Sequence, residues 1–132
     1  RECQSSLVID AEIRVGSTAY LPAALMIDTG TQVPLELYSP YVEKEHLLMQ
    51  DGLMQIELQG LGGHHDASHG RPGYLRMNDR EIKLADVYLS RAGSGIASRT
   101  DIDGALGVQS LKKSQLVINC NEGYAIINPA LN

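Results

Sequence analysis

The sequence lacks tryptophan and phenylalanine altogether, so its six tyrosines are the only large aromatic side chains. Scattered tyrosines are more often packing residues than ligands, and none is assigned a functional role. Cysteine is also rare, and the sequence contains only Cys3 and Cys120. Two cysteines are too few for a disulfide framework. They either form one bridge in an oxidising compartment or serve as small buried apolar residues, and the sequence leaves both alternatives open.

Long apolar runs and clusters of positive charge are both missing. The longest apolar stretch, near residues 23–27, is far shorter than the roughly 20 residues that a membrane-spanning helix requires. Lysine and arginine total 11 against 16 aspartates and glutamates, which gives a net charge of −5. We therefore expect no membrane span in this chain and no nucleic-acid partner.

The composition that is present is typical of an ordinary globular domain. The chain has 132 residues, of which 43% are apolar and 20% are charged. We predict a single domain over residues 1–132, with a core of about residues 7–129 and without repeats or linkers. Because the chain begins at Arg1, it is expected to be a processed product or an excised piece from which any targeting segment has been removed. The localisation is therefore unknown.

Short segments of alternating apolar and polar residues predict an all-β domain. Residues 7–15 alternate with a period of two, and a turn at Gly16 and Ser17 separates them from a second strand over about 20–27. Further strands are expected over residues 33–37, 53–58, 74–77, 81–89 with a break near Ala85 and Asp86, 116–119 and 124–127. Many short strands separated by turns indicate a sandwich or a barrel.

Helical segments are expected to be few and short. Ser39 is predicted to cap a helix over residues 41–49, with Pro40 in the first helical position, and one or two helical turns are expected over 108–113. Residues 53–58 and 74–77 are predicted to be the two arms of a long hairpin, because the segment between them is rich in glycine.

The most informative motif is a carboxylate that follows a short apolar segment, in residues 26–31 (MIDTGT). Met26 and Ile27 are expected to anchor a strand in the core, so that Asp28 is held on a rigid base. Gly30 allows close backbone approach, and the threonine hydroxyls can fix the orientation of the carboxylate by hydrogen bonds.

A single carboxylate is a poor catalyst of amide hydrolysis, because the reaction needs both a base that activates water and an acid. Two carboxyl groups about 3 Å apart share one proton and supply both functions. The chain offers no second unit of the same kind, since residues 101–104 (DIDG) lack the apolar pair and the hydroxyl residue. A two-fold axis that brings together Asp28 of two copies would supply the missing group.

The order of segments along the chain resembles the retropepsin family of aspartic proteases, most closely its cellular and bacterial members. The shared features are a strand pair, the Asp-Thr-Gly-Thr loop, a glycine-rich hairpin, and residues 103–107 (DGALG) before a short helix and a closing strand. The resemblance spans roughly residues 7–129. It implies an acid-protease fold, a closed β-barrel or sandwich with a flap hairpin and one or two short helices.

The resemblance also implies roles for individual residues. Asp28 would be the catalytic acid and base, with Thr29 and Gly30 in the same loop and the Thr29 hydroxyls bracing the two loops of a homodimer. Residues 105–107 would pack beneath this loop. Residues 60–73 would be the flap that closes over a bound peptide. The candidate substrate-binding residues of the flap are Gly62, Gly63, His64 and His65.

The histidines of the flap allow another interpretation. His65 and His69 are four residues apart and would share one face if the segment were helical, which suits a metal site. The glycines that flank them favour a mobile loop with solvent-facing histidines instead. We therefore expect neither a metal site nor a cofactor.

These features predict an aspartic-type endopeptidase, a hydrolase that cleaves a polypeptide substrate with water activated by an Asp28 pair across a homodimer. Two alternatives remain open. The fold can be retained as a weakly active or inactive dimerisation or peptide-binding module, because fold alone does not establish activity. Asp28 can also merely cap a turn in an unrelated β-sandwich.

Overall fold

The computed structural model describes residues 8–16, 19–28, 33–49, 54–60, 63–69, 72–77, 80–91, 98–107, 114–119 and 124–129. Within these residues the chain is mostly β-strand, and its helical part is small, with α1 (Ser39–Lys44) and the 3₁₀ helix η1 (Leu47–Met49) as its two described elements. The prediction of an all-β domain is therefore confirmed. Neither of these two helical segments has the length and hydropathy needed to cross a membrane.

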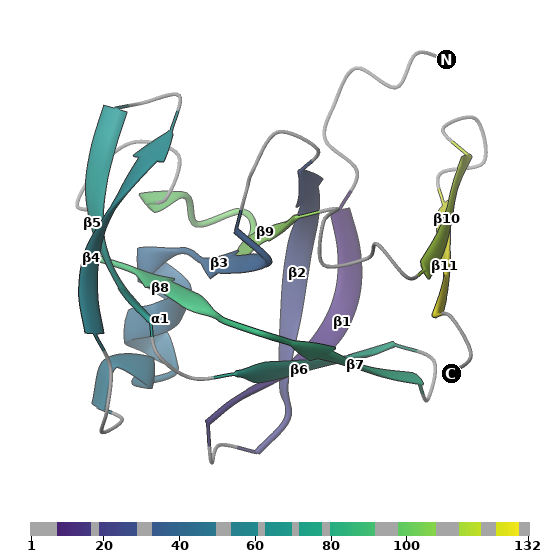
Figure 1. Cartoon of the computed structure of the whole chain (residues 1–132), viewed down its shortest axis with the longest axis horizontal. Helices are drawn as coiled ribbons and strands as arrows, with labels where there is room; N and C mark the ends of the chain where they lie inside the picture. The colour runs from purple at the N-terminus through teal and green to yellow at the C-terminus, as the bar shows by residue number, and fades with distance from the viewer. Residues whose placement is uncertain are drawn as a thin grey trace.

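Nine of the described strands form one sheet (Figure 1). Its strands, from one edge to the other, are β4 (Met54–Gly60), β5 (Gly63–His69), β8 (Tyr88–Ser90), β3 (Leu35–Leu37), β9 (Gly104–Gly107), β2 (Leu21–Asp28), β1 (Val8–Val15), β6 (Gly73–Met77) and β7 (Arg80–Leu84). Among the described pairings, β4 and β7 are the two ends of an open row.

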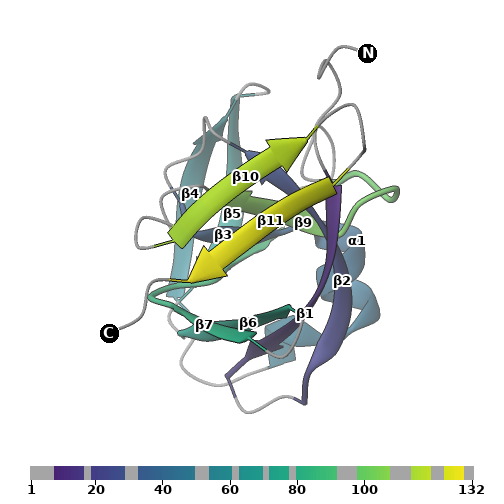
Figure 2. The ribbon, with the colours of Figure 1, turned by 90° about the vertical axis from the view of Figure 1, so that its right-hand side faces the viewer.

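Two further strands, β10 (Ser114–Asn119) and β11 (Tyr124–Pro129), form a separate antiparallel pair. Figure 2 shows this pair in front of the sheet when the molecule is viewed from the side of β1. Their positions agree with the strands predicted over 116–119 and 124–127. The helical turns predicted over 108–113 lie outside the described residues.

The alternation of apolar and polar residues places one face of the sheet in a hydrophobic core. In β1, the side chains of Ala11, Ile13 and Val15 are buried, while the residues between them are half-buried or exposed. Leu25 and Ile27 repeat this pattern in the neighbouring strand β2. Burial of each side chain of this size stabilises the fold by about 1.5–3 kcal/mol. Residues from α1, η1 and five other strands complete the core.

The helix predicted over 41–49 is shorter and begins earlier. Tyr38, not Ser39, is the N-cap residue of α1, and it makes no capping hydrogen bond with its side chain. Ser39 is already helical, and proline follows within the first turn, where its missing N–H costs nothing. His46, with φ of 55°, separates α1 from η1. The prediction of a Ser39 cap is therefore wrong.

The predicted hairpin has a different second arm. β4 pairs with β5, from Met54 opposite His69 to Gly60 opposite Gly63, so most of the glycine-rich segment is itself a strand. The strand over residues 73–77 pairs instead with β1 and β7. The prediction that 53–58 and 74–77 are the two arms is therefore wrong. By contrast, the predicted break near Ala85 is confirmed, because β7 ends at Leu84 and β8 begins at Tyr88.

Candidate active site

Asp28 is the last residue of β2 and lies beside the end of β9. β9 runs parallel to β2, with Asp28 opposite Gly107, and antiparallel to β3 on its other side. The chain thus leaves β2 on one side of β9 and re-enters the sheet on the other side. There the Gly107 N–H donates a 2.9 Å hydrogen bond to the Pro34 carbonyl oxygen. Asp28 is half-buried at this position, and Thr29 and Gly30 lie outside the described residues.

The close approach of β3 and β9 depends on Gly104. A Cβ atom at this residue would lie 2.3 Å from the Glu36 carbonyl oxygen and 3.1 Å from the Leu37 Cα. Both are backbone atoms, so no side-chain rotation relieves the contact. Glycine is therefore required for β3 to pack against the strand that also supports Asp28.

The side chains of β2 alternate between two faces near Asp28. Leu25 and Ile27 enter the main core and are 0% and 8% exposed, which confirms the prediction that Ile27 anchors the strand. Met26 and Asp28 lie on the opposite face, because successive side chains of a strand point to opposite sides. Met26 was expected in the main core but packs against a second, smaller cluster of buried residues, which are Tyr38, Ile102 and Ala105.

Residues of four neighbouring strands continue the face that carries Asp28. Met26 is opposite Ala105, which in turn is opposite Glu36, and Glu36 is opposite Tyr88. Side chains of paired residues project to the same side of a sheet. We call this surface the Asp28 face, and its members are Met26, Asp28, Glu36, Tyr88 and Ala105.

Asp103 holds the backbone of β2 in place. Its carboxylate Oδ2 accepts a 2.7 Å hydrogen bond from the Ala24 N–H, and its own N–H donates a 2.8 Å bond to the Ala24 carbonyl oxygen. The Asp103 carbonyl oxygen accepts a further 2.8 Å bond from the Tyr38 N–H. This aspartate therefore has a structural role, joining β2 to the start of α1.

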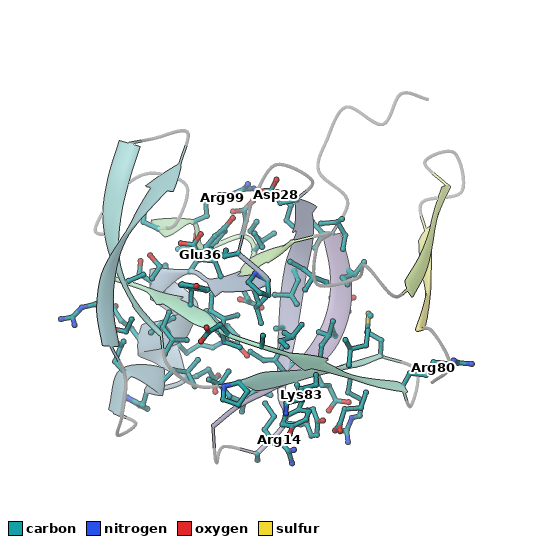
Figure 3. All side chains as sticks on the ribbon, viewed as in Figure 1. Arg14, Asp28, Glu36, Arg80, Lys83 and Arg99 are labelled. Carbon is teal, nitrogen blue, oxygen red and sulfur yellow. The ribbon has the colours of Figure 1, made fainter. Side chains whose placement is uncertain are left out.

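Figure 3 shows Arg99 toward the same end of the molecule as Asp28. Arg99 forms a bidentate ion pair with Asp101. Nε of Arg99 lies 2.9 Å from Oδ1 of Asp101, and Nη2 lies 2.5 Å from Oδ2. The hydrogen bonds from Arg99 hold the pKa of the Asp101 carboxyl below its ordinary value. Because both side chains are largely solvated, the pair contributes little to stability, but it orients the guanidinium.

The Tyr38 hydroxyl is influenced by the charges of several residues at this end of the molecule. Its pKa is raised to about 12, mainly because burial removes water from the hydroxyl and next because Glu36 is negatively charged. Arg99 acts in the opposite direction, while Asp28 and Asp101 add to the rise. The Tyr38 hydroxyl is therefore within the field of all four charged groups and stays protonated at neutral pH.

The predicted flap residues lie on the hairpin at the sheet edge. Gly63 begins β5, and His64 and His65 follow within that strand, while Gly62 lies outside the described residues. β5 pairs with β8 only through Ala67 and Ser68 in the described part of the chain, so its first half has β4 as its partner. Figure 1 shows the tip of this hairpin and the Asp28 end of β2 toward the same end of the molecule.

The helical pairing considered for His65 and His69 is wrong, because both residues belong to a strand. Four residues of extended chain span roughly 13 Å, which is too far for two ligands of one metal ion. Where side chains are described, no group of three or more His, Cys, Asp or Glu residues is placed to hold a metal. Cys3 and Cys120 lie outside the described residues.

Sequence reasoning did not assign Glu36, Tyr38 or Arg99 to the site. One signal was present, because Leu35 and Leu37 flank Glu36 and an alternating strand places its middle residue on the opposite face. What the sequence does not contain is the order of the strands. Only the pairing of β3 with β9 brings Glu36 onto the same face as Asp28.

Comparisons with known proteins do not assign the chain to a family. No protein-family model matches the sequence, and a search of curated proteins also gives no match. Function is therefore inferred from the site itself. The site consists of Asp28, at the end of β2 where β9 lies between β2 and β3, and of the residues that share its face.

Proposed function

We propose that the chain is one subunit of a retropepsin-like aspartic endopeptidase and that its sheet belongs to the acid-protease fold. The observation that carries this proposal is the position of Asp28 at the end of β2, where β9 separates β2 from β3. This arrangement holds the Asp28 carboxylate at the end of a strand that is fixed in the sheet by its pairing with β9. Thr29 and Gly30 would continue the catalytic loop from Asp28.

A homodimer supplies the second carboxylate that hydrolysis needs. Asp103 belongs to the segment of the sequence that most resembles a second motif, but its carboxylate already accepts a hydrogen bond from the Ala24 N–H. Asp101 is paired with Arg99. Asp28 of a second copy is therefore the partner we propose, because a two-fold axis brings identical groups together. The two carboxyl groups would titrate as one coupled pair.

The chemistry follows from a pair that shares one proton. The ionised carboxylate removes a proton from a water molecule, whose oxygen attacks the peptide carbonyl carbon while the protonated carboxyl donates to the carbonyl oxygen. Collapse of the tetrahedral intermediate breaks the C–N bond, and a proton passes to the leaving nitrogen. No covalent intermediate with the protein is required.

The hairpin of β4 and β5 is the proposed flap. In the described part of the chain its tip residues pair only across the hairpin itself, while the base of the hairpin is joined to β8 through Ala67 and Ser68, which suits a segment that opens and closes. A peptide would lie extended between this hairpin and Asp28, with alternate side chains directed to opposite sides.

A second candidate function is that of a dimerisation or peptide-binding module with weak or absent catalysis. The same face would then bind a peptide without cleaving it. Replacement of Asp28 separates the two candidates, because it abolishes cleavage in the first case and leaves peptide binding unchanged in both.

The direct test compares the wild type with Asp28→Asn on a diverse peptide library from about pH 3 to pH 8. We expect the variant to remain folded and dimeric in sedimentation experiments and to lose at least about 100-fold in cleavage rate. Asp10→Asn, at an exposed position of β1, is the matched control and should retain full activity. Equal cleavage by the wild type and Asp28→Asn would remove Asp28 from the mechanism.

A further inference from the structure

A row of basic and aromatic residues crosses β1, β6 and β7. Arg14 of β1 is opposite Tyr74 of β6, which in turn is opposite Lys83 of β7. Side chains of paired residues project to the same side of a sheet. We call these three residues the basic row. Figure 3 shows Arg14 and Lys83 toward the end of the molecule opposite to Asp28, so the basic row is separate from the candidate active site.

Two aromatic rings hold the Arg14 guanidinium in place. Its Cζ lies over the rings of Tyr20 and Tyr74, at 5.2 Å and 4.5 Å from their centroids. The Tyr20 hydroxyl donates a hydrogen bond to the Glu81 carboxylate, and the same ring lies 3.9 Å from Cζ of Arg76. Because Tyr20 is fixed at both its ring and its hydroxyl, the guanidinium between the tyrosines is positioned before any ligand binds.

The donor groups of Arg14 are not used within the described structure. Its Nε is buried without a hydrogen-bond partner, and no described side chain accepts a hydrogen bond from its other nitrogens. Arg76 differs, because its Nε and Nη2 lie 3.2 Å and 3.0 Å from the two carboxylate oxygens of Glu12. The Nη groups of Arg14 are not enclosed as its Nε is, and the side chain is half-buried. They are therefore available to an acceptor from outside the chain.

The charges of this surface leave an excess of positive charge in the basic row. The neighbouring carboxylates already have partners, since Glu12 is paired with Arg76 and Glu81 accepts a hydrogen bond from Tyr20. Lys83 is exposed and forms no ion pair with a carboxylate that the structure describes. Three cations thus face two carboxylates, and the cations without an ion-pair partner are the two ends of the basic row.

The spacing of the row allows both cations to reach one group. Two strand spacings of about 4.8 Å separate the backbones of Arg14 and Lys83. Each side chain extends about 6 Å from its backbone, so their end groups can approach the same ligand above Tyr74. A single carboxylate would balance only one of the two charges. A phosphate monoester carries a charge of about −1.5 to −2 at neutral pH and three acceptor oxygens, which suits a guanidinium and an ammonium group together.

We propose that the basic row binds a phosphate monoester, with two phosphate oxygens on the Nη groups of Arg14 and the third near the Lys83 ammonium. The site binds its ligand without breaking a bond. The proposal is independent of proteolysis, because it uses no residue of the Asp28 face. The ligand class is defined by the phosphate group, which either a phosphorylated polypeptide or a free phosphate ion provides.

Nuclear magnetic resonance of the ¹⁵N-labelled protein tests the proposal. Inorganic phosphate, a phosphoserine peptide and the same peptide without phosphate are each titrated while the backbone amide signal of Tyr74 is followed. We expect a phosphate compound to bind with a Kd on the order of 1 mM. Arg14→Gln should weaken this binding about tenfold, and Lys83→Gln about threefold to fivefold, because Lys83 is the more solvated cation.

Arg80→Gln is the matched control. It removes the same charge from β7 as Lys83→Gln, also at an exposed position. Successive side chains of a strand alternate, so Arg80 projects to the face opposite to Lys83 and its removal should leave the affinity unchanged. The far-ultraviolet circular dichroism of each variant checks its fold. If Arg14→Gln does not fold, the exposed Lys83→Gln still tests the site.

The outcomes separate a specific site from general attraction of anions. Absence of a shift with both phosphate compounds at ten times the expected Kd, or equal weakening by Arg80→Gln and Lys83→Gln, would overturn the proposal. Tighter binding of the phosphoserine peptide than of inorganic phosphate would support the site and identify a phosphorylated polypeptide as the source. Equal binding of the two, with the expected losses in the variants, would support a site for the free ion.

Discussion

Asp101 and Asp103 are separated by one residue and differ in their surroundings. Asp103 accepts a hydrogen bond from the Ala24 N–H in a partly buried position, whereas Asp101 is paired with Arg99 at the surface. An unsatisfied buried N–H costs about 1–3 kcal/mol, while an exposed ion pair contributes little. The two aspartates therefore allow a structural carboxylate to be compared with a surface carboxylate two positions away in the sequence.

We predict that Asp103→Ala lowers the free energy of unfolding by about 2 kcal/mol, because it leaves the Ala24 N–H without its acceptor. Asp103→Asn retains a carbonyl oxygen and should lose less. Urea unfolding at neutral pH gives the values. Asp101→Ala is the matched control and should have a much smaller effect, so equal losses at the two positions would contradict the structural role of Asp103.

Glu36 could not be assigned to the site from the sequence alone. Glu36 has the sequence signal of an outward-facing strand residue between two buried leucines, which is common in β-proteins. Asp28 was recognisable because it belongs to a compact motif of neighbouring residues. Glu36 becomes part of the same surface only through the pairing of β3 with β9, a contact between distant segments.

At the element scale, α1 and the residue before it contain two tyrosines that respond to alkaline pH. Burial is the largest cause of the raised pKa of both Tyr38 and Tyr41. The Tyr41 hydroxyl also donates a 2.9 Å hydrogen bond to the Pro22 carbonyl oxygen, which connects α1 to the start of β2. Ionisation of either hydroxyl places a charge in a poorly hydrated position.

We predict that the fold loses stability between about pH 10 and pH 12. The pKa of Tyr38 is about 12 in the folded protein and 10.0 without the fold, so folding favours the protonated form. This contribution is complete below pH 10 and is lost as the pH rises through 12, amounting to on the order of 2 kcal/mol.

Absorbance of tyrosinate during an alkaline titration, combined with urea unfolding at each pH, measures this effect. Tyr38→Phe should remove one late-titrating group and reduce the loss of stability at high pH. Titration of all six tyrosines near pH 10 in the folded protein would contradict the prediction.

Element positions were predicted better than element partners. The alternation in residues 7–15 and the turn at Gly16 depend on neighbouring residues, and the structure places β1 and β2 accordingly. The partner of β4 was misjudged because glycines were taken as a loop, whereas the strand over residues 63–69 is stabilised by its pairing with β4. Cross-strand hydrogen bonds override weak local preferences, and the sequence does not encode them locally.

At the scale of the whole molecule, the described sheet is open, and the sequence contains the Asp-Thr-Gly motif of Asp28 once. An aspartic protease needs two such carboxylates facing each other, so the proposed activity would belong to a pair of chains. The face that carries Asp28 also carries Glu36, and the hairpin of β4 and β5 reaches toward the same end of the molecule (Figure 1). Catalysis and peptide binding would thus occur at one site.

The most direct measurement mixes wild-type and Asp28→Asn chains, unfolds and refolds them together, and follows peptide cleavage at constant total concentration. If each active site needs Asp28 from both copies, an equal mixture retains about a quarter of the wild-type rate, because only dimers of two wild-type chains are active. Retention of about half of the rate would show that each chain acts alone and would contradict the shared Asp28 pair.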